Sequence, residues 1–301
     1  MPLRNEFFSG LRRDGYTRLA VCRFSGYTNA AAKELSPLEM EATIESRGAY
    51  VRRLKEEVLP ELADKSFEVI ECSMTPYQAE LYAEARSELE LLLRKMDNTL
   101  FRRNLATYFQ KRAALLQICV SPALVGGKEA QSGKYAQLEI LVRNILAQPG
   151  KKVVIWSTYT KSLDHIMTMF QESGIVRVDG TVPDQATRQK SISSFQGDPA
   201  VRIFLGNPAA AGAGITLTAA SDAIYVSFSN QAAHYMQSID RIHRIGQRAK
   251  SVTLHLLVSK STIETSVVRA LARKQSAQSS VLGDISDQGW SLAEAIQELT
   301  G

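Results

Sequence analysis

The sequence predicts an α/β fold in which a mostly parallel sheet is flanked by helices, with a helical protrusion beside it. Two observations lead to this prediction. From about residue 150 onward, short apolar runs alternate with amphipathic helical stretches, the pattern of repeated strand–helix–strand units. Between about 75 and 122 the pattern is helical only, which sets this segment apart from the alternating part.

The first half of the chain is expected to contain one strand and two helices. Residues 67–74 alternate between apolar and polar as a strand does. A long amphipathic helix should follow, with Thr75 as N-cap and Pro76 at the first helical position, and its apolar face steps by three and four residues to Leu100. A second helix should end near Val120, before a polar, glycine-bearing connector over 126–134.

The second half is expected to hold five more strands, each short and apolar. They span 152–156, 176–180, 201–205, 223–226 and 252–258. Helices are expected between and after them, among them 184–195 with Ile192 and Phe195 turned inward, 262–275 bracing the sheet, and a terminal helix over 291–300. In a parallel sheet ligands bind at the carboxyl ends of the strands, so residues that follow a strand are the first candidates for a site.

The composition is that of a globular protein with a small basic excess. Hydrophobic residues make up 45% of the 301 residues and charged residues 22%, so a packed core can form. Lys and Arg number 36 against 31 Asp and Glu, which gives 36 − 31 = +5. This excess permits contact with a polyanion without requiring it.

Cysteine and hydropathy patterns narrow the class of protein. The three cysteines, Cys22, Cys72 and Cys119, are far apart and form no CxxC, so neither a disulfide framework nor a zinc cluster is indicated. A reducing, cytoplasmic setting fits this usage. No apolar run approaches the ~20 residues that span a bilayer, and the N-terminus has no signal-peptide core, so no membrane partner is expected.

The most specific motif is QSIDRIHRIGQ, residues 237–247. If its first half is helical, Arg241 and Arg244 lie three residues apart on one face. Two neighbouring guanidinium groups repel each other and are best tolerated around an anion, and their fork geometry suits phosphate oxygens. Gln237 and Asp240 would orient them. The alternative is a solvated basic helix.

The second motif is GNPAAAGAGITLTAAS, residues 206–221, directly after an expected strand. Its small residues would let a ligand approach the backbone, and a glycine turn that leads into a helix offers N–H groups to an anion. A dinucleotide-binding fingerprint does not fit, because its third glycine would fall at Leu217. A close-packed turn between strand and helix is the alternative.

Two further stretches place polar groups at expected strand ends. VVIWSTYT, residues 153–160, supplies Ser157 and Thr158, and the stretch 178–189 supplies Thr181 and Arg188. Hydroxyl and guanidinium groups in such positions commonly contact a nucleic-acid backbone. Taken singly, they would serve equally well as helix caps and turn residues.

In order and spacing these motifs resemble the C-terminal motor lobe of the Swi/Snf-type ATPases of helicase superfamily two. That lobe has a strand ending in FS.YT, a DG(S/T) turn with an RQ helix behind it, an AGG.G.NLT.A loop and the signature QA.DR.HRIGQ. Here HRIGQ is matched at residues 243–247, and TIE at 262–264. Upstream, residues 50–66, 74–82 and 115–124 resemble the family's RR.K..V...LP.K, MT..Q..LY and LRQIC.HPAL segments, so the resemblance covers about 20–275.

The resemblance implies a RecA-like lobe and a role for each matched residue. Arg244 would be the arginine finger that reaches the γ-phosphate of ATP, with Arg241 assisting. The nucleotide edge of the cleft would be lined by Gly212, Gly214, Gln237 and Asp240. The DNA track would be lined by Ser157, Thr158, Gly180, Thr181 and Arg188.

The sequence departs from the family pattern in two places. The loop has Ala211 and Thr216 where the family has Gly and Asn, and the segment before Gln237 lacks the usual D..WNP. This variant is more similar to the compact bacterial or phage branch of the family than to a chromatin remodeller.

Phosphoryl transfer needs parts that the sequence does not show. A P-loop would read GxxxxGK[ST], but the nearest string, Gly126–Lys128, is followed by Glu129, and no adjacent Asp-Glu pair occurs. ATP with Mg²⁺ is therefore expected to be bound mainly by a first lobe outside this chain, and the chain alone is expected to be inactive.

The expected organisation has four parts. Residues 1–66 would be the trailing segment of the first lobe and the crossing between lobes, 67–125 the first strand and the protrusion, 126–275 the RecA-like C-terminal helicase lobe, and 276–301 a C-terminal tail and helix. The expected partners are double-stranded DNA and the N-terminal ATPase lobe, in the same or a separate chain, in the cytoplasm at the nucleoid. The alternative function is a non-catalytic nucleic-acid-binding or protein-interaction module.

Overall fold

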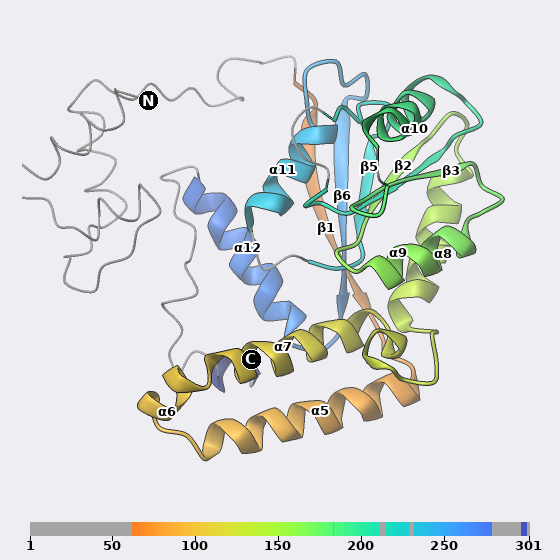
Figure 1. The fold of residues 1–301 in the computed structure, drawn as a ribbon. Helices are drawn as coiled ribbons and strands as arrows, with labels where there is room; N and C mark the ends of the chain where they lie inside the picture. The colour runs from red at the N-terminus through yellow and green to blue at the C-terminus, as the bar shows by residue number, and fades with distance from the viewer. Residues whose placement is uncertain (1–61, 183, 211–214, 229–231, 279–295, 300–301) are drawn as a thin grey trace, which may run out of the picture. The chain divides into compact units, whose positions relative to one another are not determined.

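The computed structural model describes residues 62–182, 184–210, 215–228, 232–278 and 296–299 (Figure 1). The chain divides into two compact units, 61–270 with 286–301, and 1–60 with 271–285. The sheet and the protrusion both belong to the first unit. The expected trailing segment 1–66 lies mostly outside the described residues.

The core of this unit is a six-stranded sheet in which every described strand pair is parallel. Its strands lie in the order β1-β6-β5-β2-β4-β3. Their bounds are β1 Asp64–Cys72, β2 Val153–Trp156, β3 Ile175–Val178, β4 Ile203–Gly206, β5 Asp222–Tyr225 and β6 Ser251–Ser259. All six predicted strands are confirmed, and the α/β prediction with them.

The central strands end level with one another. Val178, Gly206, Trp156 and Tyr225 share one register row across β3, β4, β2 and β5. The residues that follow them form one edge of the sheet, here called the carboxyl edge, and the residues before the strands form the opposite amino edge. All side chains of β2, β4 and β5 are buried, as expected for parallel strands covered on both faces.

The two faces of the sheet are covered by different helices. On one face, Val153 and Ile155 pack in a cluster with α8 Gly133–Leu146 and α9 Thr160–Met169. On the other, Phe204 packs against Phe195 of α10 Gln185–Gly197, with ring centroids 5.5 Å apart. There, Tyr225 packs against Tyr235 of α11 Ala232–Ile242, with centroids 4.9 Å apart. Alternate residues of each short strand thus pack against helices on opposite faces of the sheet.

The first strand belongs to the same sheet as the others. β1 pairs with β6 over nine residues, from Asp64 with Ser251 to Cys72 with Ser259. The boundary expected at residue 66 therefore falls inside a strand, and β1 is not part of a segment separate from the sheet. The polar, exposed pattern of an edge strand gave no sign of its partner in the sequence.

The protrusion consists of α5 Pro76–Arg94, α6 Asn98–Arg103, α7 Leu105–Val120 and the 3₁₀ turn η1 Pro122–Val125. The predicted start of α5 is confirmed, since Thr75 and Gln78 form a reciprocal capping box. Gln78 also donates to the carbonyl oxygens of Ile118 at 2.7 Å and Cys119 at 3.1 Å, which joins the start of α5 to the end of α7.

The long helix predicted to reach Leu100 ends earlier. The carboxylate of Asp97 accepts hydrogen bonds of 2.8 Å from the amides of Thr99 and Leu100, so Asp97 caps a new helix, α6. Two other segments complete the described part. α12 spans Glu264–Gln278, with Val267 and the preceding Ile263 buried, and residues 296–299 are helical.

Candidate functional site

Three hydroxyl groups meet at the carboxyl edge where β2 and β5 end. Ser227 Oγ lies 2.9 Å from Thr158 Oγ1 and 3.3 Å from Ser157 Oγ, and it accepts a hydrogen bond of 2.8 Å from the Thr158 amide. Ser157 is fully buried, whereas Thr158 is half-buried at the surface. Thr158 is therefore placed to contact a ligand, and Ser157 supports it from within.

Close packing at β4 brings the neighbouring loop to the same place. A Cβ on Gly206 would lie 2.8 Å from the Trp156 indole, so only glycine leaves room for that ring. The side-chain amide of Asn207, the next residue, donates to the Thr158 carbonyl at 3.2 Å. The ends of β2, β4 and β5 are thus fixed to one another by hydrogen bonds.

The turn after β3 is organised by a buried carboxylate. Asp179 is 1% exposed and accepts from the amide of Thr181 at 2.9 Å and from its hydroxyl at 2.6 Å. Arg177 donates to the same carboxylate through Nε and Nη2. Burial would raise the pKa of Asp179, but the hydrogen bonds from Thr181 and Arg177 outweigh burial and lower it below its usual range. Sequence reasoning missed the roles of Asp179 and Arg177, although it predicted the turn itself.

Gly180 and Thr181 are exposed on this turn, and Arg188 lies beside it. The Arg188 guanidinium donates to the carbonyl oxygens of Val182 at 3.0 Å and Asp179 at 3.2 Å. These bonds use only part of its five N–H donors, so the group is held in place with donors left for an anion. β4 separates β3 from β2, which puts this turn about 10 Å from Thr158 along the carboxyl edge.

The arginine motif lies at the amino edge instead. Because β5 and β6 are parallel, the intervening α11 must run back toward the start of the strands. Near its end, the Arg241 carbonyl accepts from the Leu217 amide at 2.8 Å, and Leu217 lies five residues before β5. Arg244 follows in the turn beyond α11, where Nη1 lies 3.4 Å from Thr216 Oγ1.

That turn is fixed by hydrogen bonds around a glycine. Gly246 has φ +95°, a conformation that other L residues rarely adopt. The Gln247 side chain donates to the carbonyl oxygens of Ala220 at 2.8 Å and Ile242 at 3.2 Å. His243 is buried, with Nε2 2.7 Å from the Ala63 carbonyl oxygen. The turn therefore presents the exposed Arg244 from a constrained backbone.

The two arginines differ in their surroundings. Arg244 is exposed, while Arg241 is half-buried, and its Nε is shielded from solvent with no hydrogen-bond partner among the described residues. A shielded donor without a partner is rare in folded proteins. Gln237 and Asp240 are exposed on the same helix. Gly212 and Gly214 lie outside the described residues.

The predicted site residues thus form two groups. Thr158, Gly180, Thr181 and Arg188 share the carboxyl edge, supported by Ser157. Gln237, Asp240, Arg241 and Arg244 lie on α11 and the turn that leads to the amino edge. The sequence analysis expected the first group at strand ends, and it assigned the arginine motif to neither edge of the sheet.

A buried ion pair lies next to the carboxyl edge, and the sequence analysis did not predict it. Lys134 Nζ and Glu264 Oε1 are 2.6 Å apart, with side chains 0% and 1% exposed. Lys134 falls in the predicted polar connector, but α8 already begins at Gly133, capped by Ser132. Glu264 stands out in the sequence only as part of TIE. An isolated lysine and glutamate 130 positions apart give no pairing signal in one sequence.

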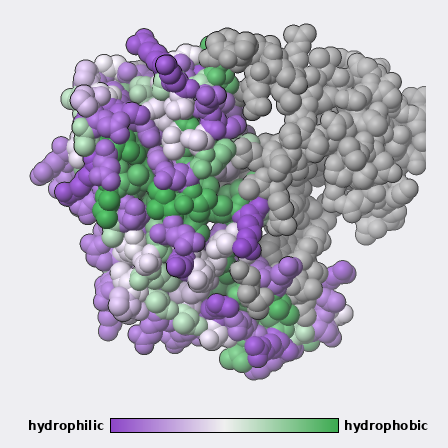
Figure 2. All heavy atoms as spheres, turned by 180° about the vertical axis from the view of Figure 1, so that it is seen from behind, coloured by the Kyte–Doolittle hydropathy of each residue, from purple (hydrophilic) through white to green (hydrophobic). Residues whose placement is uncertain are grey.

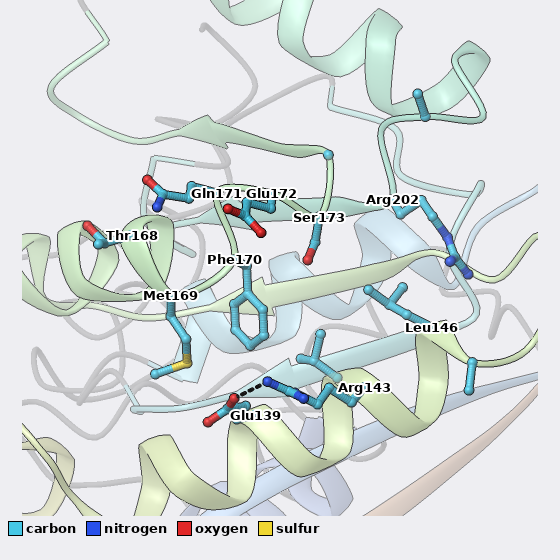
Figure 3. A pocket seen from close by; sticks show the side chains of 14 residues that line it. Glu139, Arg143, Leu146, Thr168, Met169, Phe170, Gln171, Glu172, Ser173 and Arg202 are labelled. Atoms are coloured by element: carbon cyan, nitrogen blue, oxygen red, sulfur yellow. Dashed lines mark hydrogen bonds and ion pairs between the residues drawn. The ribbon is translucent and has the colours of Figure 1, made fainter.

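Other surface features do not coincide with these residues. A hollow of about 630 Å³ opens at the amino edge between the ends of α8 and α9 (Figure 3). At its rim Arg143 pairs with Glu139 at 2.6 Å, and Arg202 donates to the carbonyls of Gln148 and Lys151. These cations are already engaged, so the hollow is a poor anion site. Figure 2 shows a band of apolar side chains between polar regions on the face seen from behind.

The described residues contain neither a metal-binding cluster nor a membrane-spanning helix. Within them, no group of three or more His, Cys, Asp or Glu side chains is arranged to hold a metal ion. No helix in the same part of the chain is both long and apolar enough to cross a membrane.

Comparison with known proteins gives concordant matches. Residues 136–246 match the family described as helicase conserved C-terminal domain. An uncharacterized ATP-dependent helicase of Mycoplasma pneumoniae is 30% identical over 261 residues, which cover 85% of this chain and 24% of the relative. Curated relatives that match are much longer, and this chain spans about a quarter or less of each of those compared.

Solved structures show the same fold. The Sulfolobus solfataricus SWI2/SNF2 ATPase C-terminal domain has a TM-score of 0.59 and 23% identity, covering 79% of this chain and 98% of that one. The ATPase core of the same name in complex with dsDNA has a TM-score of 0.62 and 22% identity, covering 93% of this chain and 58% of that one. The shared fold is the RecA-like α/β lobe of helicases.

Proposed function

We propose that this chain, which matches a helicase conserved C-terminal domain over residues 136–246 and shares the fold of a SWI2/SNF2 ATPase C-terminal domain, is the second motor lobe of an ATP-dependent translocase on double-stranded DNA. It would supply the arginine finger and part of the DNA track. Hydrolysis would require a first lobe, in the same or a separate chain.

The observation that supports this proposal most is the environment of the arginine pair. Arg244 is exposed on a constrained turn, and its one described side-chain bond, to Thr216, is long at 3.4 Å. Arg241 carries a shielded Nε without a partner among the described residues. Guanidinium groups with donors left for an anion are what a triphosphate requires from the lobe opposite its binding site.

Of the residues present, the arginine pair fits one part of ATP, its terminal phosphates. Arg244 would contact the γ-phosphate, where a guanidinium stabilises the charge that develops during transfer. Arg241 would assist Arg244, with Gln237 and Asp240 along the same helix as Arg241; Gly212 and Gly214 are proposed for the nucleotide edge of the cleft from the motif alone. Mg²⁺ and the attacking water would be held by the first lobe.

The carboxyl edge would contact DNA phosphates. The donors available are the Thr158 hydroxyl, the exposed turn at Gly180 and Thr181, and the remaining N–H groups of Arg188. The hydroxyl and amide of Thr181 already donate to Asp179, so its part would be to shape the turn. Ser157 would act through Ser227. One structure of similar fold is a SWI2/SNF2 ATPase core in complex with dsDNA, which supports this choice of partner.

The arginine assignment is tested in this chain joined to a first lobe, here called the extended protein. We expect duplex DNA to stimulate ATP hydrolysis by the extended protein, and Arg244→Ala to lower kcat by ~10³-fold or more with DNA affinity unchanged. Arg248→Ala is the matched control, since Arg248 is an arginine in the same turn that the proposal leaves without a role. A fully active Arg244→Ala protein would refute the finger assignment.

The same measurement decides against the alternative function. If the extended protein hydrolyses no ATP while the chain binds DNA in a salt-sensitive way, the chain is a nucleic-acid-binding module with a helicase-lobe fold. We also propose that the motor is of a compact bacterial or phage type and acts on DNA in the cytoplasm. This part of the proposal rests on the glycine loop, which departs from the family pattern.

A further inference from the structure

The Lys134–Glu264 ion pair has no role in the proposed chemistry, yet it is the most deeply buried ion pair of the described residues. Lys134 lies in the first turn of α8 and Glu264 is the first residue of α12. A cation in the first turn of a helix is opposed by the helix dipole. Placing a charged lysine there must therefore serve some purpose other than helix stability.

Burial makes the pair a poor source of folding stability. Removing two charges from water costs about as much as their attraction returns, and well-packed apolar residues often serve a core as well or better. What a buried pair can provide is a fixed geometry, because each charged atom demands particular partners. The hydrogen-bond partners of Lys134 and Glu264 show which part of the structure the pair holds in place.

Both side chains also form hydrogen bonds with backbone groups at the ends of strands. Lys134 Nζ donates to the Val226 carbonyl at 2.8 Å, one residue beyond β5. Glu264 Oε2 accepts from the amide of Ser259, the last residue of β6, at 2.8 Å. The ammonium also lies 5.5 Å from the centre of the Phe228 ring. The pair thus ties α8 and α12 to the carboxyl ends of two adjacent strands.

Ser227, the residue between Val226 and Phe228, belongs to the carboxyl edge that we propose contacts DNA. Val226 and Phe228 flank Ser227, whose Oγ accepts from the Thr158 amide and contacts the Thr158 hydroxyl. A shift of the Val226 carbonyl would move Ser227 and release Thr158. Ser227 is 2% exposed, so it would transmit this effect without touching a ligand itself.

We infer that Lys134 and Glu264 are positioning residues that set the Ser227–Thr158 hydroxyl cluster and, through it, the DNA-contacting edge. The second half of this inference rests on the proposed function. The first half concerns the chain alone, so the two can be tested separately.

The test compares a double variant of the full chain, Lys134→Met with Glu264→Gln, against the wild type. The glutamine amide oxygen introduced at position 264 would still accept from Ser259, while the bond to the Val226 carbonyl is lost. The first readout is hydrogen exchange of the Thr158 amide by NMR, which we expect to accelerate at least tenfold. Ser227→Ala removes the last link without disturbing the ion pair, and it should accelerate the same amide even if the double variant folds poorly.

The matched control is the other buried ion pair, Arg112–Glu298, with side chains 8% and 7% exposed. It lies on α7 and the C-terminal segment, and not at the strand ends. Arg112→Met with Glu298→Gln should leave Thr158 exchange unchanged. Unchanged exchange in the Lys134/Glu264 variant, or equal acceleration in the control, would overturn the inference.

The second readout is affinity for duplex DNA. We expect roughly tenfold weaker binding in the Lys134/Glu264 variant, the effect of one hydrogen bond to a charged group, and less than about a twofold further loss on adding Ser227→Ala. Altered exchange with unchanged DNA affinity would overturn the functional half. A wild-type chain that binds no DNA would contradict the proposed DNA contact, while Thr158 exchange still decides the positioning role.

Discussion

Asp222, the first residue of β5, contacts three polar side chains: His255 of β6, the neighbouring Ser221, and Lys151 from the segment before β2. Its Oδ1 lies 3.2 Å from His255 Nε2, and its Oδ2 accepts from Ser221 Oγ at 2.8 Å and from Lys151 Nζ at 3.0 Å. Burial would raise the pKa of Asp222, but these hydrogen bonds outweigh it and lower the pKa to about 2. The ionised carboxylate therefore contributes to the stability of the sheet.

Since the folded pKa of Asp222 is depressed, its contribution is complete above the pKa of the unfolded chain and is lost as pH falls toward the folded value. We expect the free energy of unfolding to drop by about 2.5 kcal/mol between about pH 5 and pH 1 on account of this residue. Urea unfolding at each pH checks this. In Asp222→Asn the drop should be smaller by that amount, and an identical slope in both proteins would contradict the assignment.

Single residues at the carboxyl edge show what the sequence could and could not predict. Thr158, Gly180 and Arg188 were predicted there because the rule that ligands bind at the carboxyl ends of parallel strands needs only a correct strand assignment. The burial of Ser157 was not predicted, because it depends on Ser227, 70 positions away. Asp179 was missed because its function is to accept hydrogen bonds within the turn.

At the scale of elements, the start of α8 is set by a close approach of two backbones. A Cβ built on Gly133 would lie 1.7 Å from the carbonyl oxygen of Ser73, just after β1. The obstacle is backbone, so no side-chain movement can relieve it. The Gly133 amide also donates to Gln78 Oε1 at 3.2 Å. This contact joins α8, β1 and α5, and it places Lys134 where it meets Glu264.

We expect Gly133→Ala to destabilise the chain by about 2 kcal/mol or more, because overpacking against fixed backbone forces α8 to shift. Gly197→Ala is the matched control: Gly197 ends α10, with open space around its added Cβ and no left-handed φ, so a change within about 0.5 kcal/mol is expected. Denaturant unfolding of both variants provides the comparison. Equal stability of the two variants would show that the approach of Gly133 to Ser73 is not a constraint.

The elements themselves were largely predictable, because the central strands are short apolar runs, while the apolar residues of the helices recur every three or four positions. Errors arose where a local cap or a distant partner decided the outcome. Asp97 interrupts the apolar stepping after Met96 by capping α6, a local signal that the stepping concealed. The start of α8 at Gly133 was obscured by the glycine-bearing connector, and β1 gave no indication that it pairs with β6, about 190 positions later.

At the scale of the whole unit, the two groups of site residues lie at opposite edges of the sheet. The carboxyl edge holds Thr158 and Arg188, and the turn beyond α11 brings Arg244 to the amino edge. Strands of four residues put these edges more than ~10 Å apart. Residues that far apart with no shared partner usually contribute independently. In the proposed motor, DNA contact and phosphate contact by this lobe should therefore be separable.

This separation predicts additive effects in the extended protein. Arg188→Ala should weaken DNA binding, reduce the slope of log K against log salt by ~0.9 for one lost phosphate contact, and leave kcat at saturating DNA within about twofold. Arg244→Ala should lower kcat and leave the salt slope unchanged, and the double variant should show both changes with neither enlarged. Salt titrations and steady-state hydrolysis on the three variants measure this. If Arg188→Ala lowers kcat at saturating DNA as strongly as Arg244→Ala does, the two edges act as one unit, and the division of labour between them is wrong.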